Sequence, residues 1–224
     1  IAMAGNPFIR VMASRLTFGH TLMPELPTIE QARKDSAATV ETFNYYKAHG
    51  VRVVNMSWGG SLASVEQALE AHNAGGTPEE RKALARQIFE ISRVALYEGI
   101  KNTPEILYVT AAGNEDNNVT FEEVIPSDFD LPNIIVVGAV DQAGDETGFT
   151  SFGNVDCYAN GYEVESYVPG GDRMRLSGTS QASPAVANLA AKILALRPQL
   201  QPTEVAELIV KGCDEKQAGE RRVK

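Results

Sequence analysis

A run without a single polar side chain, at residues 134–140 (Ile-Ile-Val-Val-Gly-Ala-Val), constrains the fold of this chain more than any other feature. A strand with one face in water alternates apolar and polar residues, whereas a strand covered on both faces reads as a continuous apolar run. Helices on both faces of a parallel sheet provide such cover. The run therefore predicts an α/β domain built on a mostly parallel sheet.

The N-terminal part of the chain has a strand–helix–strand pattern. Residues 8–16 alternate loosely and are interpreted as a strand, and residues 28–49 as a helix. Thr28 is a good N-cap, and Gly50 is placed to end the helix in the left-handed conformation. Residues 51–56 then read as a buried strand. Such a unit implies parallel strands joined by a right-handed crossover.

The same alternation of strands and helices continues along the chain, without a repeat, a low-complexity tract or an interdomain linker. We therefore expect one doubly wound domain over residues 1–224, with helices on both faces and its sites at the carboxyl ends of the strands. The further elements expected are helices at 61–73, from Thr77, from Ser180 and at 204–211, a strand at 106–111, and two short strands within 162–176.

Composition limits the classes of partner. The chain has 224 residues, of which 43% are hydrophobic, enough for one domain with its own core. Its formal net charge of −9 argues against nucleic acid and anionic membranes, because phosphate binding relies on clustered Lys and Arg. No apolar run approaches the roughly 20 residues that a membrane span needs. We therefore expect neither a nucleic-acid partner nor a membrane span.

Cys157 and Cys213 are the two cysteines of the chain. No CxxC motif or Cys/His cluster accompanies them, which argues against a structural zinc site. The sequence is equally compatible with one disulfide and with two buried thiols.

A Gly-Thr-Ser turn at residues 178–180 leads directly into an apolar helical pattern. A hydroxyl in the first turn of a buried helix lies beside unpaired backbone N–H groups and the positive end of the helix dipole. Ser180 is thus well placed to act as a nucleophile and to have its oxyanion stabilised. The alternative interpretation is an ordinary capping residue, since Ser and Thr are common at helix starts.

Three segments carry a resemblance to a known family. Residues 178–184 (Gly-Thr-Ser-Gln-Ala-Ser-Pro) resemble the serine motif of the subtilisin-like (subtilase) serine peptidases. Residues 53–60 resemble the substrate-binding strand of that family, and residues 108–115 resemble its oxyanion-hole segment. The similarity runs from about residue 9 to residue 212. It implies a subtilisin-like fold and a serine endopeptidase that forms an acyl-enzyme on Ser180.

Asn114 is the oxyanion-hole residue that the resemblance implies. A carboxamide N–H held after a strand can point at a developing negative charge. Asn is otherwise ordinary in such a turn. Sedolisin-like peptidases, which share the serine turn, resemble subtilases with an Asp at this position, so Asn114 favours the subtilisin branch.

The resemblance also implies a substrate cleft in which an extended peptide pairs with the enzyme as an added strand. Small residues in its walls let the substrate backbone approach closely. Trp58, the single Trp of the chain, is interpreted as a bulky lining that favours apolar side chains, the alternative being a core or rim aromatic. The two walls are expected to consist of Ser57, Trp58, Gly59, Ala111, Ala112 and Gly113.

The Asp and His of a subtilase triad have no counterpart in the sequence. The Asp-Ser/Thr-Gly and His-Gly-Thr-His motifs are absent, and the three histidines, His20, His49 and His72, lack the family context. Residues 1–7 resemble the family segment just after the catalytic His helix. We therefore expect an N-terminally incomplete domain, the C-terminal part of a catalytic domain, whose Asp and His lie upstream of Ile1 in a partner fragment of the same protein.

Without that piece the chain is not expected to be catalytically competent. The alternative is a non-catalytic pseudopeptidase that binds peptides. A doubly wound nucleotide-binding protein is poorly supported, because no glycine-rich phosphate-binding motif follows any strand.

The family resemblance implies no required cofactor, a structural calcium ion as an option, and a secreted or cell-envelope location. Calcium takes carboxylate and carbonyl oxygens. Acidic loops are more often simply solvated, and we assign no metal residue. The acidic loop residues considered are Glu115, Asp116, Asp141, Asp145 and Glu146.

Overall fold

A four-stranded parallel sheet forms the centre of the molecule. The computed structural model describes residues 1–2, 5–14, 26–213, 216–218 and 221–223, with side chains up to Cys213. The strands lie in the order β1 (Val53–Met56), β2 (Leu107–Ala111), β3 (Ile134–Val140) and β4 (Cys157–Asn160). Every residue of β2 and β3 is buried. This confirms the covered strand predicted from the apolar run.

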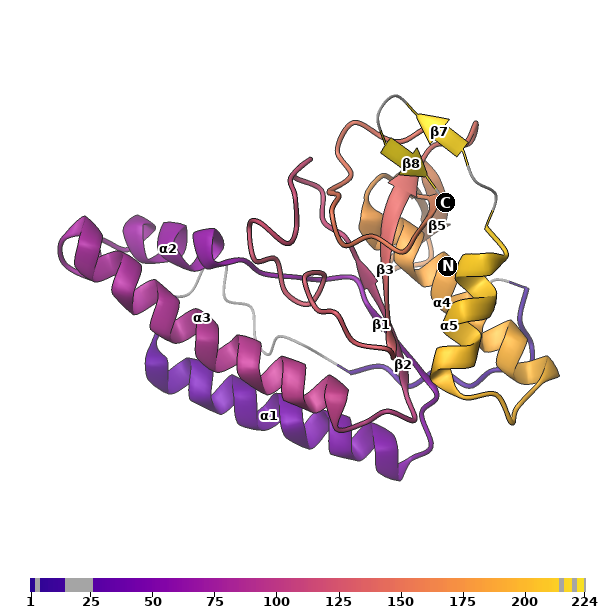
Figure 1. Ribbon diagram of the computed structural model, residues 1–224, viewed down its shortest axis with the longest axis horizontal. Helices are drawn as coiled ribbons and strands as arrows, with labels where there is room; N and C mark the ends of the chain where they lie inside the picture. The colour runs from indigo at the N-terminus through magenta and orange to yellow at the C-terminus, as the bar shows by residue number, and fades with distance from the viewer. Residues whose placement is uncertain (3–4, 15–25, 214–215, 219–220, 224) are drawn as a thin grey trace.

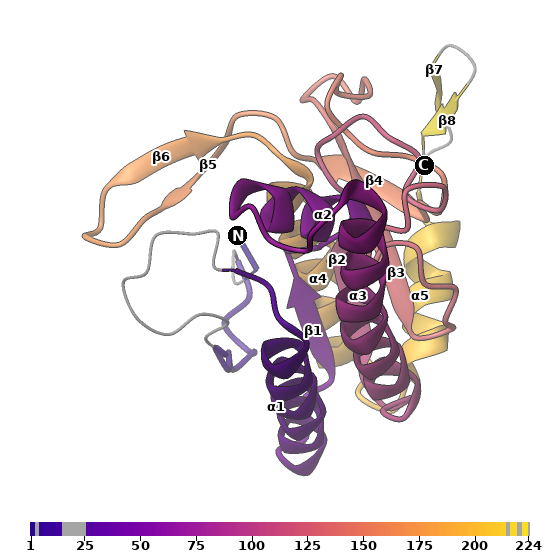
Figure 2. The same ribbon diagram turned by 90° about the vertical axis from the view of Figure 1, so that its left-hand side faces the viewer.

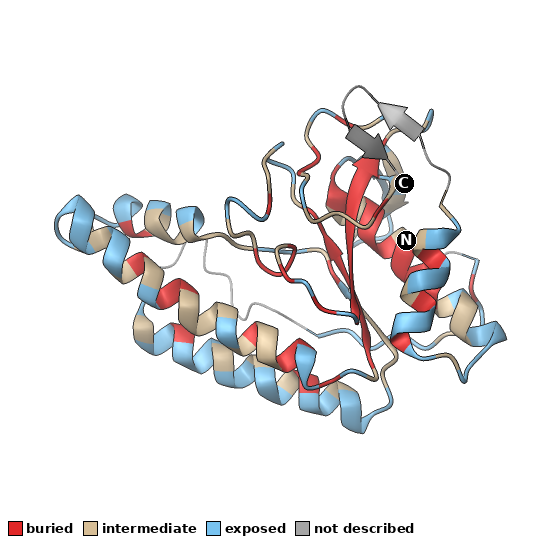
Figure 3. Cartoon of the chain, viewed as in Figure 1, coloured by how far each residue is buried: buried red, intermediate tan, exposed pale blue. Residues whose placement is uncertain are grey.

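Helices cover both faces of the sheet, as predicted (Figure 1). On one face lie α1 (Ile29–Ala48), α2 (Leu62–Ala71) and α3 (Pro78–Lys101). On the other lie α4 (Thr179–Leu196) and α5 (Pro202–Lys211). Figure 3 shows the buried residues concentrated on the strands and on the inward side of α4, with the outer sides of α1 and α3 exposed.

Successive side chains of β2 pack against the helices on opposite faces of the sheet, because side chains alternate in direction along a strand. Leu107 and Val109 belong to the hydrophobic cluster beneath α4 and α5. Tyr108 belongs to the cluster beneath α1 and α3, where its ring meets Phe43 edge-on at 5.2 Å between centroids. The Tyr108 hydroxyl hydrogen-bonds to Thr103 Oγ1 at 2.7 Å, so its polar end is satisfied inside the core.

Helices α1, α2 and α3 also extend beyond the sheet and pack on one another there (Figure 1). Ala32 of α1, Leu69 of α2, and Ala85 and Ile88 of α3 form a separate small cluster at that end. The expected helix starts are present: Thr28 accepts from Gln31 N at 3.1 Å, and Thr77 forms a capping box with Glu80.

Two boundaries differ from the sequence-based expectation. The described residues 8–14 form no strand, because none of the described strands pairs with them; residues 15 and 16 lie outside the described part. The last helix begins at Pro202, not at residue 204, with Gln201 as its N-cap in place of Thr203. Proline suits the first helical position, and Glu204 accepts the Gln201 N–H at 2.7 Å.

A β-hairpin projects from the body of the molecule (Figure 2), formed by β5 (Val164–Tyr167) and β6 (Arg173–Leu176). These are the two short strands expected around the Pro-Gly-Gly turn. A second small hairpin, β7 (Lys216–Ala218) and β8 (Arg221–Val223), lies near the C-terminus. None of the helices in the described ranges is long and apolar enough to cross a membrane.

Candidate active site

The start of α4 places Ser180 in the first helical turn. Gly178 is the N-cap, so Ser180 is the second helical residue and not the capping residue of the alternative interpretation. The Gly178 N–H donates to the Gly161 carbonyl at 2.8 Å, which fixes the entry of the chain into the helix. Ser180 is half-buried and lies in the first turn of the helix, at the positive end of the helix dipole.

Asn114, which follows β2, is joined directly to this helix start. Its Oδ1 accepts hydrogen bonds from Thr179 N at 2.8 Å and from Thr179 Oγ1 at 3.1 Å. A backbone N–H can only donate, so the Asn114 atom that meets it is the amide oxygen, and the amide nitrogen is left as a donor. Among the described residues no hydrogen bond uses Asn114 Nδ2. The Gly113 N–H donates to Thr179 Oγ1 at 3.1 Å and ties the turn to α4 a second time.

Ser57, which follows β1, is in reciprocal contact with Ser180. Ser180 Oγ donates to the Ser57 carbonyl at 3.3 Å, and Ser57 Oγ donates to the Ser180 carbonyl at 3.0 Å. The carboxyl ends of β1 and β2 therefore meet the start of α4, and the structure brings Ser57, Asn114 and Ser180 together.

Two further polar residues support this arrangement and were not singled out from the sequence. Ser183 Oγ donates to Asn55 Oδ1 at 2.9 Å, and Asn55 Nδ2 donates to Ser57 Oγ at 3.0 Å. Their sequence spacing from Ser57 and Ser180 is the signal that could have indicated them. Asn55 lies two residues before Ser57 on one face of a strand, and Ser183 lies one helical turn after Ser180.

The expected cleft walls differ in how much surface they offer. Ala111 and Ala112 are 8% and 0% exposed, whereas Trp58 is 37% exposed and so is not a core residue. The segment after Ser57 pairs with Ile125 through Gly60 N to Ile125 O at 3.0 Å and Ile125 N to Gly60 O at 2.8 Å. A Cβ on Gly59 would lie 3.0 Å from the Ile125 carbonyl oxygen, so only glycine fits there without a shift.

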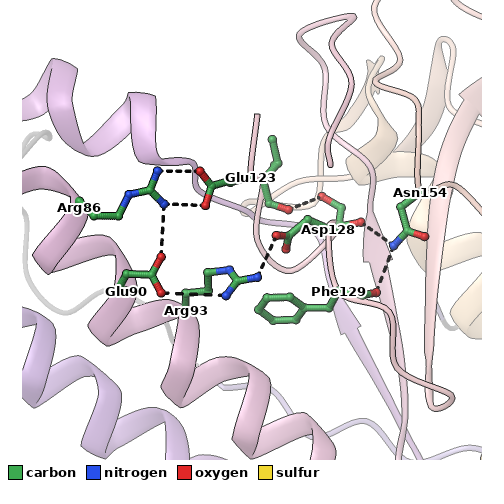
Figure 4. Close-up of polar contacts among 9 residues, drawn as sticks. Arg86, Glu90, Arg93, Glu123, Asp128, Phe129 and Asn154 are labelled. Atoms are coloured by element: carbon green, nitrogen blue, oxygen red, sulfur yellow. Dashed lines mark hydrogen bonds and ion pairs between the residues drawn. The ribbon is translucent and has the colours of Figure 1, made fainter. Parts of the chain in front are cut away.

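The loop between Asn114 and β3 is fastened to α3 by charged side chains (Figure 4). Arg86 forms a bidentate pair with Glu123, with N–O distances of 2.6 and 2.7 Å, and also contacts Glu90 at 3.3 Å. Arg93 reaches Asp128 at 3.7 Å. Bidentate pairing fixes geometry as well as charge, so α3 holds this loop in place from outside the sheet.

Asp128 is the most strongly perturbed carboxyl of the loop. Its side chain is 6% exposed, and its Oδ1 has no hydrogen-bond partner in the described part of the structure. Burial raises the pKa of Asp128 to about 6, although the Arg93 charge acts in the opposite direction. Folded Asp128 therefore binds a proton more readily than unfolded Asp128 does.

This pKa predicts a specific pH dependence of stability. Because the folded state holds the proton between about pH 4 and 6, the free energy of unfolding decreases as the pH rises through that window. Asp128→Asn removes the effect. We expect the difference in the free energy of unfolding, Asp128→Asn minus native chain, to increase by roughly 2 kcal/mol when the pH is raised from 4.5 to 7.5. Urea unfolding at the two pH values measures this difference. Glu122→Gln, at an exposed carboxylate of the same loop, is the control and should keep the pH dependence of the native chain. Parallel pH profiles for Asp128→Asn and the native chain would contradict the raised pKa of Asp128.

Gly161 determines how closely β4 and the start of α4 approach. A Cβ at this position would lie 2.6 Å from the Gly178 carbonyl oxygen and 2.7 Å from Ala139 Cβ. We expect Gly161→Ala to displace Gly178 and to lower the free energy of unfolding by about 1–3 kcal/mol. Gly148→Ala is the matched control, since no atom lies within 4 Å of the added Cβ. Equal unfolding curves for the two variants would show that the close packing has no energetic role.

The described histidines do not contact Ser180. The Nδ1 atoms of His49 and His72 lie 2.8 and 2.9 Å from the carbonyl oxygens of Tyr45 and Ala68, each within or at the end of its own helix. His20 lies outside the described residues.

The acidic loop residues make contacts with backbone N–H groups. Within the described ranges, no group of three or more His, Cys, Asp or Glu side chains could hold a metal ion. Asp141 Oδ1 instead accepts backbone N–H groups from Ala143 and Asp145 at 2.8 and 2.9 Å. Glu115 Oε2 accepts the Asn114 N–H at 2.7 Å.

Comparison with known proteins identifies the family. The sequence model of the Subtilase family (peptidase S8) matches residues 10–223. A solved structure of a cold adapted subtilisin-like serine proteinase superposes with a TM-score of 0.58 over 83% of this chain and 57% of that chain, at 21% identity, and so supports the fold. The arrangement is thus that of an α/β serine-peptidase fold, and the chain belongs to the subtilase family.

Curated relatives match over parts of their length. Subtilisin DY of Bacillus licheniformis is 30% identical over 173 residues, which is 75% of this chain and 52% of that protein. A subtilisin-like protease of Coccidioides posadasii is 30% identical over 73% of this chain and 34% of its own length. A thermophilic serine proteinase of Bacillus sp. (strain AK1) is 44% identical over 84 residues, 37% of this chain and 20% of that protein. The chain therefore spans between a fifth and about half of these three relatives.

Proposed function

We propose that this chain is the C-terminal part of the catalytic domain of a serine endopeptidase, with Ser180 as nucleophile and Asn114 in the oxyanion hole. The observation that carries the proposal is the hydrogen bond from Thr179 N to Asn114 Oδ1, which leaves Nδ2 as a donor without a hydrogen-bond partner among the described residues. Family membership supports the reaction class, since subtilisins and subtilisin-like proteases are among its relatives.

In the proposed reaction a base removes the proton of Ser180 Oγ as the oxygen attacks the carbonyl carbon of the scissile peptide. The tetrahedral oxyanion accepts hydrogen bonds from the Ser180 N–H and from Asn114 Nδ2. Its collapse breaks the C–N bond, the base returns the proton to the leaving amine, and water then hydrolyses the acyl-enzyme. No metal or cofactor is needed for these steps. A structural calcium ion remains a prediction from the family.

The base and its carboxylate partner are proposed to come from upstream of Ile1, as a histidine and an aspartate in a preceding fragment. In the described structure His49 and His72 are engaged by their own helices. Strand β1 has a hydrogen-bonded neighbour only on its β2 side among the described strands. The chain that leaves β1 continues directly to Ser57, which contacts Ser180. We therefore propose that the upstream fragment binds along the other edge of β1.

The proposed substrate is an extended peptide or protein segment with apolar side chains. It would lie between the segment that holds Ser57, Trp58 and Gly59 and the segment that holds Ala111, Ala112 and Gly113. The exposed Trp58 ring and the small Gly59 support an apolar cleft that a peptide backbone can approach. The net charge of −9 disfavours nucleic acid as a partner. A secreted or cell-envelope location is proposed from family resemblance.

Labelling with a serine-reactive fluorophosphonate tests the proposal. The chain is prepared with and without the segment encoded upstream of it, and the labelled residue is identified by peptide mass mapping. We expect labelling confined to Ser180 when the upstream segment is present. Ser177→Ala, which removes an exposed hydroxyl three residues away, is the control that should retain labelling. An unlabelled Ser180 in the presence of an intact upstream segment would favour the peptide-binding pseudopeptidase.

A further inference from the structure

The two cysteines, distant in sequence, meet in the core under α5. Cys157 is the first residue of β4 and is 1% exposed. Cys213 follows the end of α5, is half-buried, and packs against the hydrophobic cluster that contains Cys157. Both are thiols in this structure.

The two thiol groups also take part in hydrogen bonds. The side chains of Cys157 and Cys213 are hydrogen-bonded to each other, and Cys213 Sγ donates to the Ile209 carbonyl at 3.2 Å. The Cys213 side chain is therefore a direct neighbour of the Cys157 thiol. This contact, together with burial, holds the pKa of Cys157 well above its usual range. Cys213, the less buried of the two residues, is the thiol that an oxidant meets first.

We propose that Cys157 and Cys213 are a redox-sensitive pair that forms an intrachain disulfide under oxidising conditions and fastens the end of α5 to β4. The inference is independent of the proposed peptidase activity, because the described contacts of both cysteines lie in the core under α5 and not at the proposed site.

The oxidant is a low-molecular-weight disulfide such as oxidised glutathione. The Cys213 thiolate attacks one sulfur of that disulfide, a mixed disulfide forms on Cys213, and one small thiolate leaves. The Cys157 thiolate then attacks Cys213 Sγ, which breaks the mixed disulfide and releases the second small thiolate. The two cysteines lose two protons and two electrons, and the small disulfide gains them as two thiols.

The expected consequence is a more stable fold, because the crosslink restricts the unfolded chain. Helix α5 otherwise rests on the body through its apolar face, with Val205 and Ile209 buried in the same cluster as Cys157. A disulfide adds a covalent connection at the end of that helix. We expect the oxidised chain to melt roughly 5–10 °C above the reduced chain.

The test equilibrates the purified chain with oxidised glutathione or with dithiothreitol. Thiols are counted in denaturant, the intact mass is measured, and thermal unfolding is recorded. We expect two thiols in the reduced chain and none in the oxidised chain, a mass lower by two hydrogen atoms, and a monomer on non-reducing gels. A tryptic peptide pair joined through Cys157 and Cys213 should appear only in the oxidised sample.

Cys213→Ser is the matched variant, since Cys213 is half-buried whereas Cys157 is fully buried. Its melting temperature should be the same under both conditions. The proposal is wrong if both thiols persist in oxidised glutathione, if a glutathione adduct on Cys213 accumulates without resolving, or if the only disulfides formed join separate chains. The comparison between the oxidised and reduced forms of the unmutated chain distinguishes these outcomes. The test therefore does not depend on the folding of any variant.

Discussion

At the proposed nucleophile, Ser180→Ala should lower kcat by about 10⁶ in the chain combined with its proposed upstream segment, a loss of the size measured for the nucleophile of a subtilisin. The residue is half-buried, and the bond from its Oγ to the Ser57 carbonyl is the one hydrogen bond of that atom among the described residues. Its removal therefore leaves the fold intact while eliminating the acyl-enzyme route. The residual rate should come from substrate binding and oxyanion stabilisation alone.

The measurement is a steady-state peptidase assay with an active-site titration, accompanied by an unfolding curve. Ser177→Ala serves as the control, because the Ser177 hydroxyl accepts the Glu163 N–H and lies outside the contacts of Ser180. Retention of more than about a hundredth of the native kcat by Ser180→Ala would assign the nucleophile to another residue. A parallel loss of stability would indicate that Ser180 has a structural role as well.

Sequence patterns predicted the core of the fold because burial on both faces leaves a strong mark. The apolar runs at 106–111 and 134–140 form β2 and β3, with the bounds shifted by one residue at most. The start of α3 follows Thr77, which forms a capping box with Glu80. A strand at 8–16 was wrong over its described residues. Loose alternation indicates that a segment can be extended, but a strand also requires a neighbour that accepts its hydrogen bonds.

The candidate site was predictable in part, because short sequence motifs mark two of its residues. Motif resemblance selected Ser180 and Asn114, and the structure brings both to the start of α4. Asn55 and Ser183 were not selected, because each resembles an ordinary polar residue until the register of β1 against α4 is known. The fastening of the 115–133 loop by Arg86 and Arg93 depends on contacts between segments distant in sequence, and no local pattern encodes those contacts.

Asn114→Asp should lower kcat by on the order of 10²–10³ or more with little change in KM, which is the cost measured for losing such a donor in a subtilisin. The amide has two separable roles. Its oxygen accepts the Thr179 N–H at 2.8 Å and holds the turn against α4, and its nitrogen is the proposed oxyanion donor. Asp keeps the oxygen and removes the donor, so the fold should remain intact. The new negative charge would also repel the developing oxyanion.

Asn114→Ala completes the comparison, since it removes both the oxygen and the nitrogen. If Nδ2 stabilises the transition state, Asp and Ala should both lose activity, and the Ala variant alone should also lose stability as the Thr179 contacts disappear. If Asn114 acts only by holding the helix start, the Asp variant should retain nearly full kcat while the Ala variant loses it. Kinetics and urea unfolding of the two variants therefore separate transition-state stabilisation from support of the Ser180 turn.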